Sequence, residues 1–105
     1  MTGGKAWPPG LCREIAVIDI AEDEAVRQFG VNFRDDRDDL DDFRFAFVQA
    51  GGRPYALQRY RRTPSAGLTL LAMDDDRVPS DQIDHFLSHH GFDRALLRWI
   101  VPDSL

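Results

Sequence analysis

The apolar and polar positions near the start of the chain follow first a strand pattern and then a helix pattern. Residues 14–20, EIAVIDI, are rich in β-branched side chains and predict a strand. Residues 21–29 repeat apolar side chains at helical spacing after an acidic first turn, which favours a helix. Gly30 is placed to end that helix, because glycine readily adopts the left-handed conformation found after a helix C-terminus.

Two further strand patterns flank a pair of glycines and predict a tight hairpin. Residues 43–48, FRFAFV, alternate aromatic or branched side chains with others, and residues 54–61 form a second extended segment. A two-glycine link permits positive φ at both central positions of the turn. We therefore expect the turn at Gly51-Gly52.

This turn fixes the register of the hairpin, because it places Ala50 opposite Arg53. Side chains then alternate between two faces of the strand pair. We expect the face that carries Phe43, Phe45 and Phe47 to form the core. The opposite face carries six residues, in cross-strand pairs: Arg44 and Arg59, Ala46 and Leu57, Val48 and Tyr55.

A third strand and a second helix are predicted in the last part of the chain. Residues 68–73, LTLLAM, are almost continuously apolar and predict the strand. Ser80 is a suitable N-cap for a helix that ends at Gly91. Asp93 can cap a last short helix, and residues 99–101 fit either that helix or an edge strand.

Together these segments predict an α+β fold. We expect an antiparallel β-meander in the order β-α-β-β-β-α, with the helices packed on one face of the sheet. Residues 1–11, rich in glycine and proline, are expected to form a flexible arm. Residues 12–105 then form a single domain, since 105 residues are enough for one modest core.

Composition restricts the class of protein. The net charge of −5 argues against nonspecific nucleic-acid binding, which depends on lysine and arginine neutralising phosphates. The chain contains no apolar run near the roughly 20 residues of a membrane helix, so no membrane association is expected. Cys12, the single cysteine, cannot form an internal disulfide, which fits a reducing compartment. We therefore expect a cytoplasmic protein.

Residues 34–42, RDDRDDLDD, concentrate six aspartates in a short run. Residues 35–39 match the DDxxD spacing of prenyl-diphosphate enzymes, but those enzymes need a large helical fold and a second acidic motif. An EF-hand counted from Asp36 would need glycine and a carboxylate at the positions of Asp41 and Phe47. The run therefore predicts neither a metal site nor a cofactor site.

The aspartate run can instead be neutralised by arginines of the same chain or by a basic partner. Our first hypothesis is a small non-catalytic interaction or regulatory module, such as an inhibitor, an immunity protein or an antitoxin. It would dock a basic protein partner through the acidic patch. The predicted patch residues are Asp35, Asp36, Asp38, Asp39, Asp41 and Asp42.

The sheet face with the arginines supports an alternative function. Arg44, Arg59 and Arg61 could bind an anion there, as in a small-ligand-binding domain or an accessory enzyme subunit. Nucleic acid is an unlikely ligand, since the predicted register turns Tyr60 inward, away from stacking. The apolar part of the same face could bind a second copy of the chain through four residues: Ala46, Val48, Tyr55 and Leu57.

No catalytic motif is found. His85 and His89 have the spacing of the HExxH zinc motif, but Phe86 stands where the glutamate is required. His90 lies on the apolar side of the predicted helix, and we expect it to be partly buried with one hydrogen bond. We therefore predict no catalytic residues.

Overall fold

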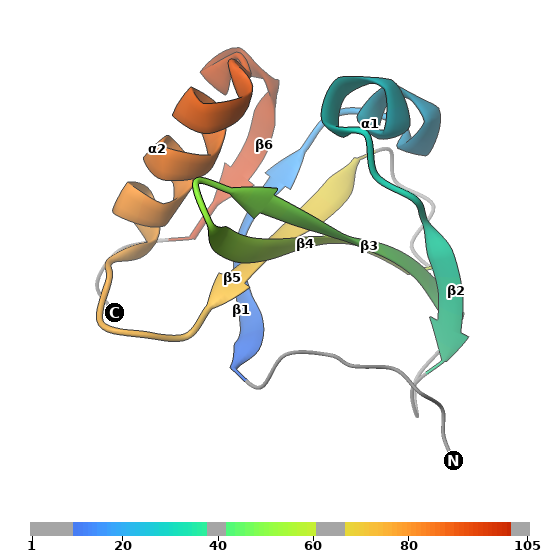
Figure 1. The fold of residues 1–105 in the computed structure, drawn as a ribbon, viewed down its shortest axis with the longest axis horizontal. Coiled ribbons are helices and arrows are strands. Elements are labelled where there is room, and N and C mark those ends of the chain that lie inside the picture. Colours follow the sequence, from blue (N-terminus) through green and yellow to red (C-terminus); the bar gives the residue numbers. More distant parts are fainter. Residues whose placement is uncertain (1–9, 38–41, 61–66, 102–105) are drawn as a thin grey trace.

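The computed structural model describes residues 10–37, 42–60 and 67–101, and these form an antiparallel sheet with two helices on one face (Figure 1). The elements follow one another in the order β1 (Leu11–Ile18), α1 (Glu22–Phe29), β2 (Arg34–Arg37), β3 (Asp42–Ala50), β4 (Arg53–Tyr60), β5 (Leu68–Met73), α2 (Pro79–His90), the 3-10 turn η1 (Arg94–Leu96) and β6 (Leu97–Ile100).

The sheet has six strands in the order β2-β3-β4-β5-β1-β6. The predicted α+β class and the meander of β3, β4 and β5 are confirmed. Two short strands, β2 and β6, extend the sheet at its two edges (Figure 1). Residues 99 and 100 belong to β6, so the edge-strand alternative for this segment is confirmed.

The hairpin of β3 and β4 has the predicted register. Ala50 pairs with Arg53, and the ladder continues to Phe43 opposite Tyr60. Both turn glycines have positive φ, 56° at Gly51 and 80° at Gly52. Sequence alone thus determined the turn type and every cross-strand pair of this hairpin.

The helices pack on the face of the hairpin opposite to Phe43, Phe45 and Phe47, and we call this side the helix face. Its hairpin residues share one core cluster with Ala25 of α1 and Phe86 of α2. The prediction that the phenylalanine face forms the core holds only in part: Phe43 and Phe45 are buried, at 8% and 0% exposure, but the large cluster with the helices lies on the other face. The phenylalanine face holds a smaller cluster, which consists of Leu11, Ala56 and Leu71 with Phe47 and Met73 packed against it.

The helix face, named above as a possible contact with a second copy, is not exposed, because the two helices already cover it. The four apolar residues are each no more than 4% exposed: Ala46, Val48, Tyr55 and Leu57. The phenolic hydroxyl of Tyr55 donates to the carbonyl of Gln82 at 3.0 Å, which fixes α2 over the sheet. Burial raises the pKa of Tyr55.

Several predicted boundaries differ from the structure, and the strand predicted over residues 14–20 is β1 at Leu11–Ile18. Val78 rather than Ser80 is the N-cap residue of α2, and Pro79 takes the first helical position, where its missing N–H costs no hydrogen bond. Leu11 belongs to β1 and is fully buried, although it was assigned to the N-terminal arm. Gly10 is also described, and its carbonyl accepts from the N–H of Asp74 at 2.8 Å, while residues 1–9 of the predicted arm lie outside the described residues. Gly30 and Gly91 end their helices in the left-handed conformation, as predicted.

The turn glycines offer a matched pair of substitutions. A Cβ at Gly51 would lie 2.9 Å from Cε1 of His85, whereas a Cβ at Gly52 would meet nothing within 4 Å. Both variants bear the left-handed backbone cost of about 1–2 kcal/mol. Gly51→Ala must in addition displace His85, so we expect it to lose roughly 1 kcal/mol more in free energy of unfolding than Gly52→Ala.

Urea unfolding followed by circular dichroism measures both variants. In a His85→Ala background the difference between the two alanine variants should disappear, because the clashing ring is gone. Equal losses for the two variants in the native background would contradict this contact.

Candidate functional site

The described part of the predicted acidic patch lies at one edge of the sheet. Asp35 and Asp36 belong to the edge strand β2, and Asp42 begins β3, where it pairs with Arg37. The side chain of Asp35 is 65% exposed. The structure therefore joins these three aspartates along one strand pair. The other predicted patch residues, Asp38, Asp39 and Asp41, lie outside the described residues.

Arg44 links the patch to the helix layer. Its Nη1 donates to Oδ1 of Asp35 at 2.9 Å, and its Nε donates to Oε1 of Glu22 at 2.7 Å. Asp35 and Arg44 lie directly opposite each other in the ladder of β2 and β3. The hydrogen bonds to Glu22 and then to Asp35 raise the pKa of Arg44. Asp35 is thus paired with an arginine of the same chain.

Glu22, the first residue of α1, lies between two arginines of the hairpin. Besides Arg44, it contacts Arg59, whose Nη1 is 3.5 Å from Oε2. Arg44 and Arg59 are cross-strand neighbours, so their like charges would repel without this carboxylate. The side chain of Glu22 is 18% exposed, which makes it the most enclosed of the three. It therefore fixes the start of α1 over the hairpin.

Both described members of the predicted anion site are therefore in contact with carboxylates. An anion at Arg44 and Arg59 would have to compete with Glu22 for the two guanidinium groups. Arg61, the third member, lies outside the described residues. Anion binding stays a prediction, and the observed ion pairs do not favour it.

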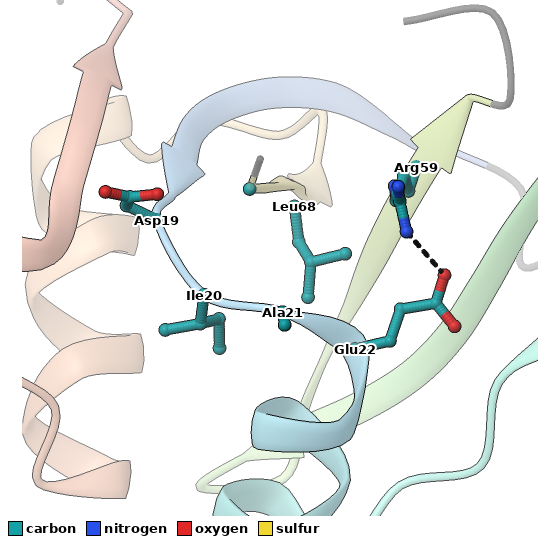
Figure 2. A pocket seen from close by; sticks show the side chains of 7 residues that line it. Asp19, Ile20, Ala21, Glu22, Arg59 and Leu68 are labelled. Carbon is teal, nitrogen blue, oxygen red and sulfur yellow. Dashed lines mark hydrogen bonds and ion pairs between the residues drawn. The ribbon is translucent and has the colours of Figure 1, made fainter. Parts of the chain in front are cut away.

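A pocket of about 270 Å³ lies beside this cluster, where the chain passes from β1 to α1. Figure 2 shows Glu22 and Arg59 pointing toward one another at its rim, with Asp19 on the far side. Asp19 also lies 3.6 Å from Nε of Arg98. The described lining has two carboxylates, one arginine and otherwise apolar or glycine residues, and Glu22 is engaged by Arg59 at 3.5 Å.

The second acidic run, residues 74–76, follows directly after the last residue of β5, Met73, and has a structural role there. Arg13 of β1 donates to the carbonyl of Arg77 at 2.8 Å and to Oδ1 of Asp74 at 2.7 Å. Arg77 forms an ion pair with Asp75 and holds the pKa of that carboxyl at about 2. These contacts close the turn between β5 and α2, and they give Asp74 and Asp75 partners within the chain.

The histidines of α2 hold the helix against the hairpin. Nε2 of His85 donates to the carbonyl of Ala50 at 2.7 Å, and Nε2 of His90 donates to the carbonyl of Gln49 at 3.1 Å. His90 is half-buried and makes this hydrogen bond, which confirms both predictions for it, and burial lowers its pKa. Across the described ranges, no three metal-ligating side chains come together.

Comparison with known proteins yields no relative: no protein-family model, curated protein or solved structure matches the chain. Within the described residues, neither helix has the length and apolar character needed to cross a membrane. The functional argument therefore depends on the geometry of the chain itself.

Sequence reasoning found Asp35, Asp36, Asp42, Arg44 and Arg59 as charged residues of interest, and the structure brings them to one end of the sheet. It missed Glu22, which it treated as a residue of an acidic first turn. The available signal was indirect: two arginines opposite each other on one face require a counter-charge. The pairing itself depends on how α1 docks.

Proposed function

We propose that the protein is a non-catalytic interaction module that docks a basic protein partner along the acidic edge formed by β2 and the start of β3. The observation that carries the proposal is the position of the run: Asp35 and Asp36 lie on an edge strand. Of the described strands, β3 is the neighbour of β2 on one side, and none lies on the other.

An edge strand can accept an extended segment of a partner, because its outer backbone groups continue the ladder. The side chains then determine which partner binds. Residues 34–42 contain six aspartates against two arginines, so an approaching lysine- or arginine-rich strand gains favourable charge contacts, whereas an acidic strand is repelled. The same charges disfavour pairing of this edge with its own copy. The edge is thus suited to a basic partner of different sequence.

The ion pair between Asp35 and Arg44 is compatible with docking. The Asp35 side chain remains 65% exposed, and Arg44 keeps a second carboxylate in Glu22 at 2.7 Å. A basic group of the partner can therefore form an ion pair with Asp35 in place of Arg44, and Arg44 keeps its ion pair with Glu22. Exposed ion pairs of this kind contribute about 0–1 kcal/mol, so the exchange costs little.

The test compares two variants of equal charge. In the edge variant, four aspartates of the run become asparagine: Asp35, Asp36, Asp38 and Asp39. In the control variant, four acidic residues elsewhere become amides: Asp23, Glu24, Asp76 and Asp81. Both variants lose four negative charges, so a difference between them reports position rather than net charge.

Affinity capture from cells that make the protein, followed by quantitative mass spectrometry, identifies the partner. We expect the wild type and the control variant to retain a basic partner that the edge variant loses. With that partner purified, the edge variant should bind roughly tenfold more weakly or worse, and wild-type affinity should fall as salt rises. Retention of every partner by the edge variant would overturn the proposal.

A further inference from the structure

The opposite edge of the sheet has a different chemistry. Strand β6 ends the sheet beyond β1, and two of its large apolar side chains are exposed, Trp99 by 45% and Ile100 by 40%. The edge strand β2, in contrast, is charged at every position. We propose that a second copy of the chain docks on β6 in antiparallel orientation, so that the two sheets join across a twofold axis.

The backbone of β6 is oriented for such pairing. The N–H of Val101 donates to the carbonyl of Ile15 in β1 at 3.0 Å. In an antiparallel ladder, successive residues direct their N–H and C=O groups to alternate sides. The backbone groups of Ile100 therefore point away from β1, toward the position that a further strand would occupy. Trp99 and Ile100 are consecutive in β6, so their side chains lie on opposite faces of the sheet, and a twofold axis near them adds one apolar contact between the copies on each face.

Charge does not prevent a second copy from docking at this edge, because the aspartate run lies at the far side of the sheet. The chain carries a net charge of −5, so two copies repel each other unless their acidic regions stay apart. The aspartate run lies at β2, five strand spacings from β6, which is about 24 Å at about 4.8 Å per spacing. This distance exceeds the Debye length of about 8 Å at physiological salt. Near the contact, Nε of Arg98 lies 3.6 Å from Oδ1 of Asp19, so the charges of these two residues offset each other.

The size of the contact determines its expected strength. Stable interfaces bury about 1,200–2,000 Å² in total, and β6 has four residues. The area buried by pairing two such short strands is smaller than that range. We therefore expect a reversible dimer with a dissociation constant on the order of 10–100 µM. The dimer leaves both β2 edges accessible, and this inference does not depend on the proposed function.

Sedimentation equilibrium of the full chain, from about 10 µM to about 1 mM, measures the association. The wild type should rise from 12.0 kDa toward twice that mass. Trp99→Lys and Ile100→Lys should each weaken the dimer at least tenfold, since a lysine on an edge strand disfavours strand pairing. The matched controls are Val26→Lys and Val78→Lys, at apolar positions that are 42% and 43% exposed outside β6, and these should dimerise like the wild type.

A second measurement uses the wild type alone and needs no variant to fold. Hydrogen exchange at the Ile100 amide should slow as concentration rises, whereas exchange in α1 should not change. The proposal is overturned by a wild type that remains monomeric to about 1 mM, by lysine variants that fold and dimerise normally, or by open-ended polymers instead of a dimer.

Discussion

Replacing Phe86 by alanine is expected to lower the free energy of unfolding by about 3–5 kcal/mol. Phe86 is fully buried between the sheet and both helices, with ring centroids 5.4 Å from Phe29, 5.0 Å from Tyr55 and 4.9 Å from His90. Truncation removes the apolar contacts of the ring and leaves a cavity that these rigid neighbours fill poorly. Because single domains have total stabilities of about 5–15 kcal/mol, the variant loses a large share.

Urea unfolding monitored by circular dichroism gives the free energy of this variant. Val26→Ala is the control, since Val26 lies on α1 and is 42% exposed, and we expect it to change stability by less than about 0.5 kcal/mol. A loss below about 1 kcal/mol for Phe86→Ala would contradict the placement of the main core on the helix face.

Replacing Arg13 by methionine is expected to lower the free energy of unfolding by about 2–4 kcal/mol, because several acceptors lose a charged donor together. Arg13 donates to the carbonyls of Arg77 and Asp75, to the carboxylate of Asp74 and to Oε1 of Gln82. The Gln82 residue is 1% exposed, so water replaces the lost bond poorly. Methionine keeps most of the apolar stem and removes the guanidinium group.

Two further variants complete the test: one separates the charge of Arg13 from its guanidinium geometry, and the other removes an exposed arginine as a control. Arg13→Lys keeps the charge but loses the fork of donors, and it should recover less than half of the loss. Arg27→Met removes an exposed arginine that pairs with Glu24 on α1, and it should cost less than about 1 kcal/mol. Similar losses for Arg13→Met and Arg27→Met would show that the network at Arg13 does not stabilise the fold.

Local sequence determined the hairpin, the third strand and the C-terminal ends of both helices because the relevant interactions lie within a few residues. Gly51 and Gly52 permit one kind of turn, and that turn sets the complete register. Gly30 and Gly91 end helices for a similar local reason.

The choice of sheet face was not local. Alternation shows which side chains share a face, but both faces of the hairpin are apolar, and the three phenylalanines suggested the wrong one for the helices. The face contacted by α1 and α2 depends on connections elsewhere in the chain, including the position of β1 inside the sheet. Larger side chains therefore do not by themselves identify the packed side.

For the candidate site, the sequence showed which residues carry charge but not which residues they contact. The aspartate run and the arginines are visible as charges, yet their partners come from distant segments: Glu22 contacts Arg44, and Arg13 contacts Asp74. Such pairs require the tertiary arrangement, because no spacing rule connects their positions in the chain. The prediction of a basic partner therefore has to be tested directly.

The position of β1 between β5 and β6 has a consequence for synthesis on the ribosome. Leu11 pairs with Met73, and Ala16 pairs with Ile100, so β1 must wait until β5 and β6 have been made before its two ladders can close. The hairpin of β3 and β4 can form earlier, because its contacts are local. During elongation the apolar segment of β1 is exposed without its neighbours, and in that interval it is the part of the nascent chain most open to chaperone binding or mispairing.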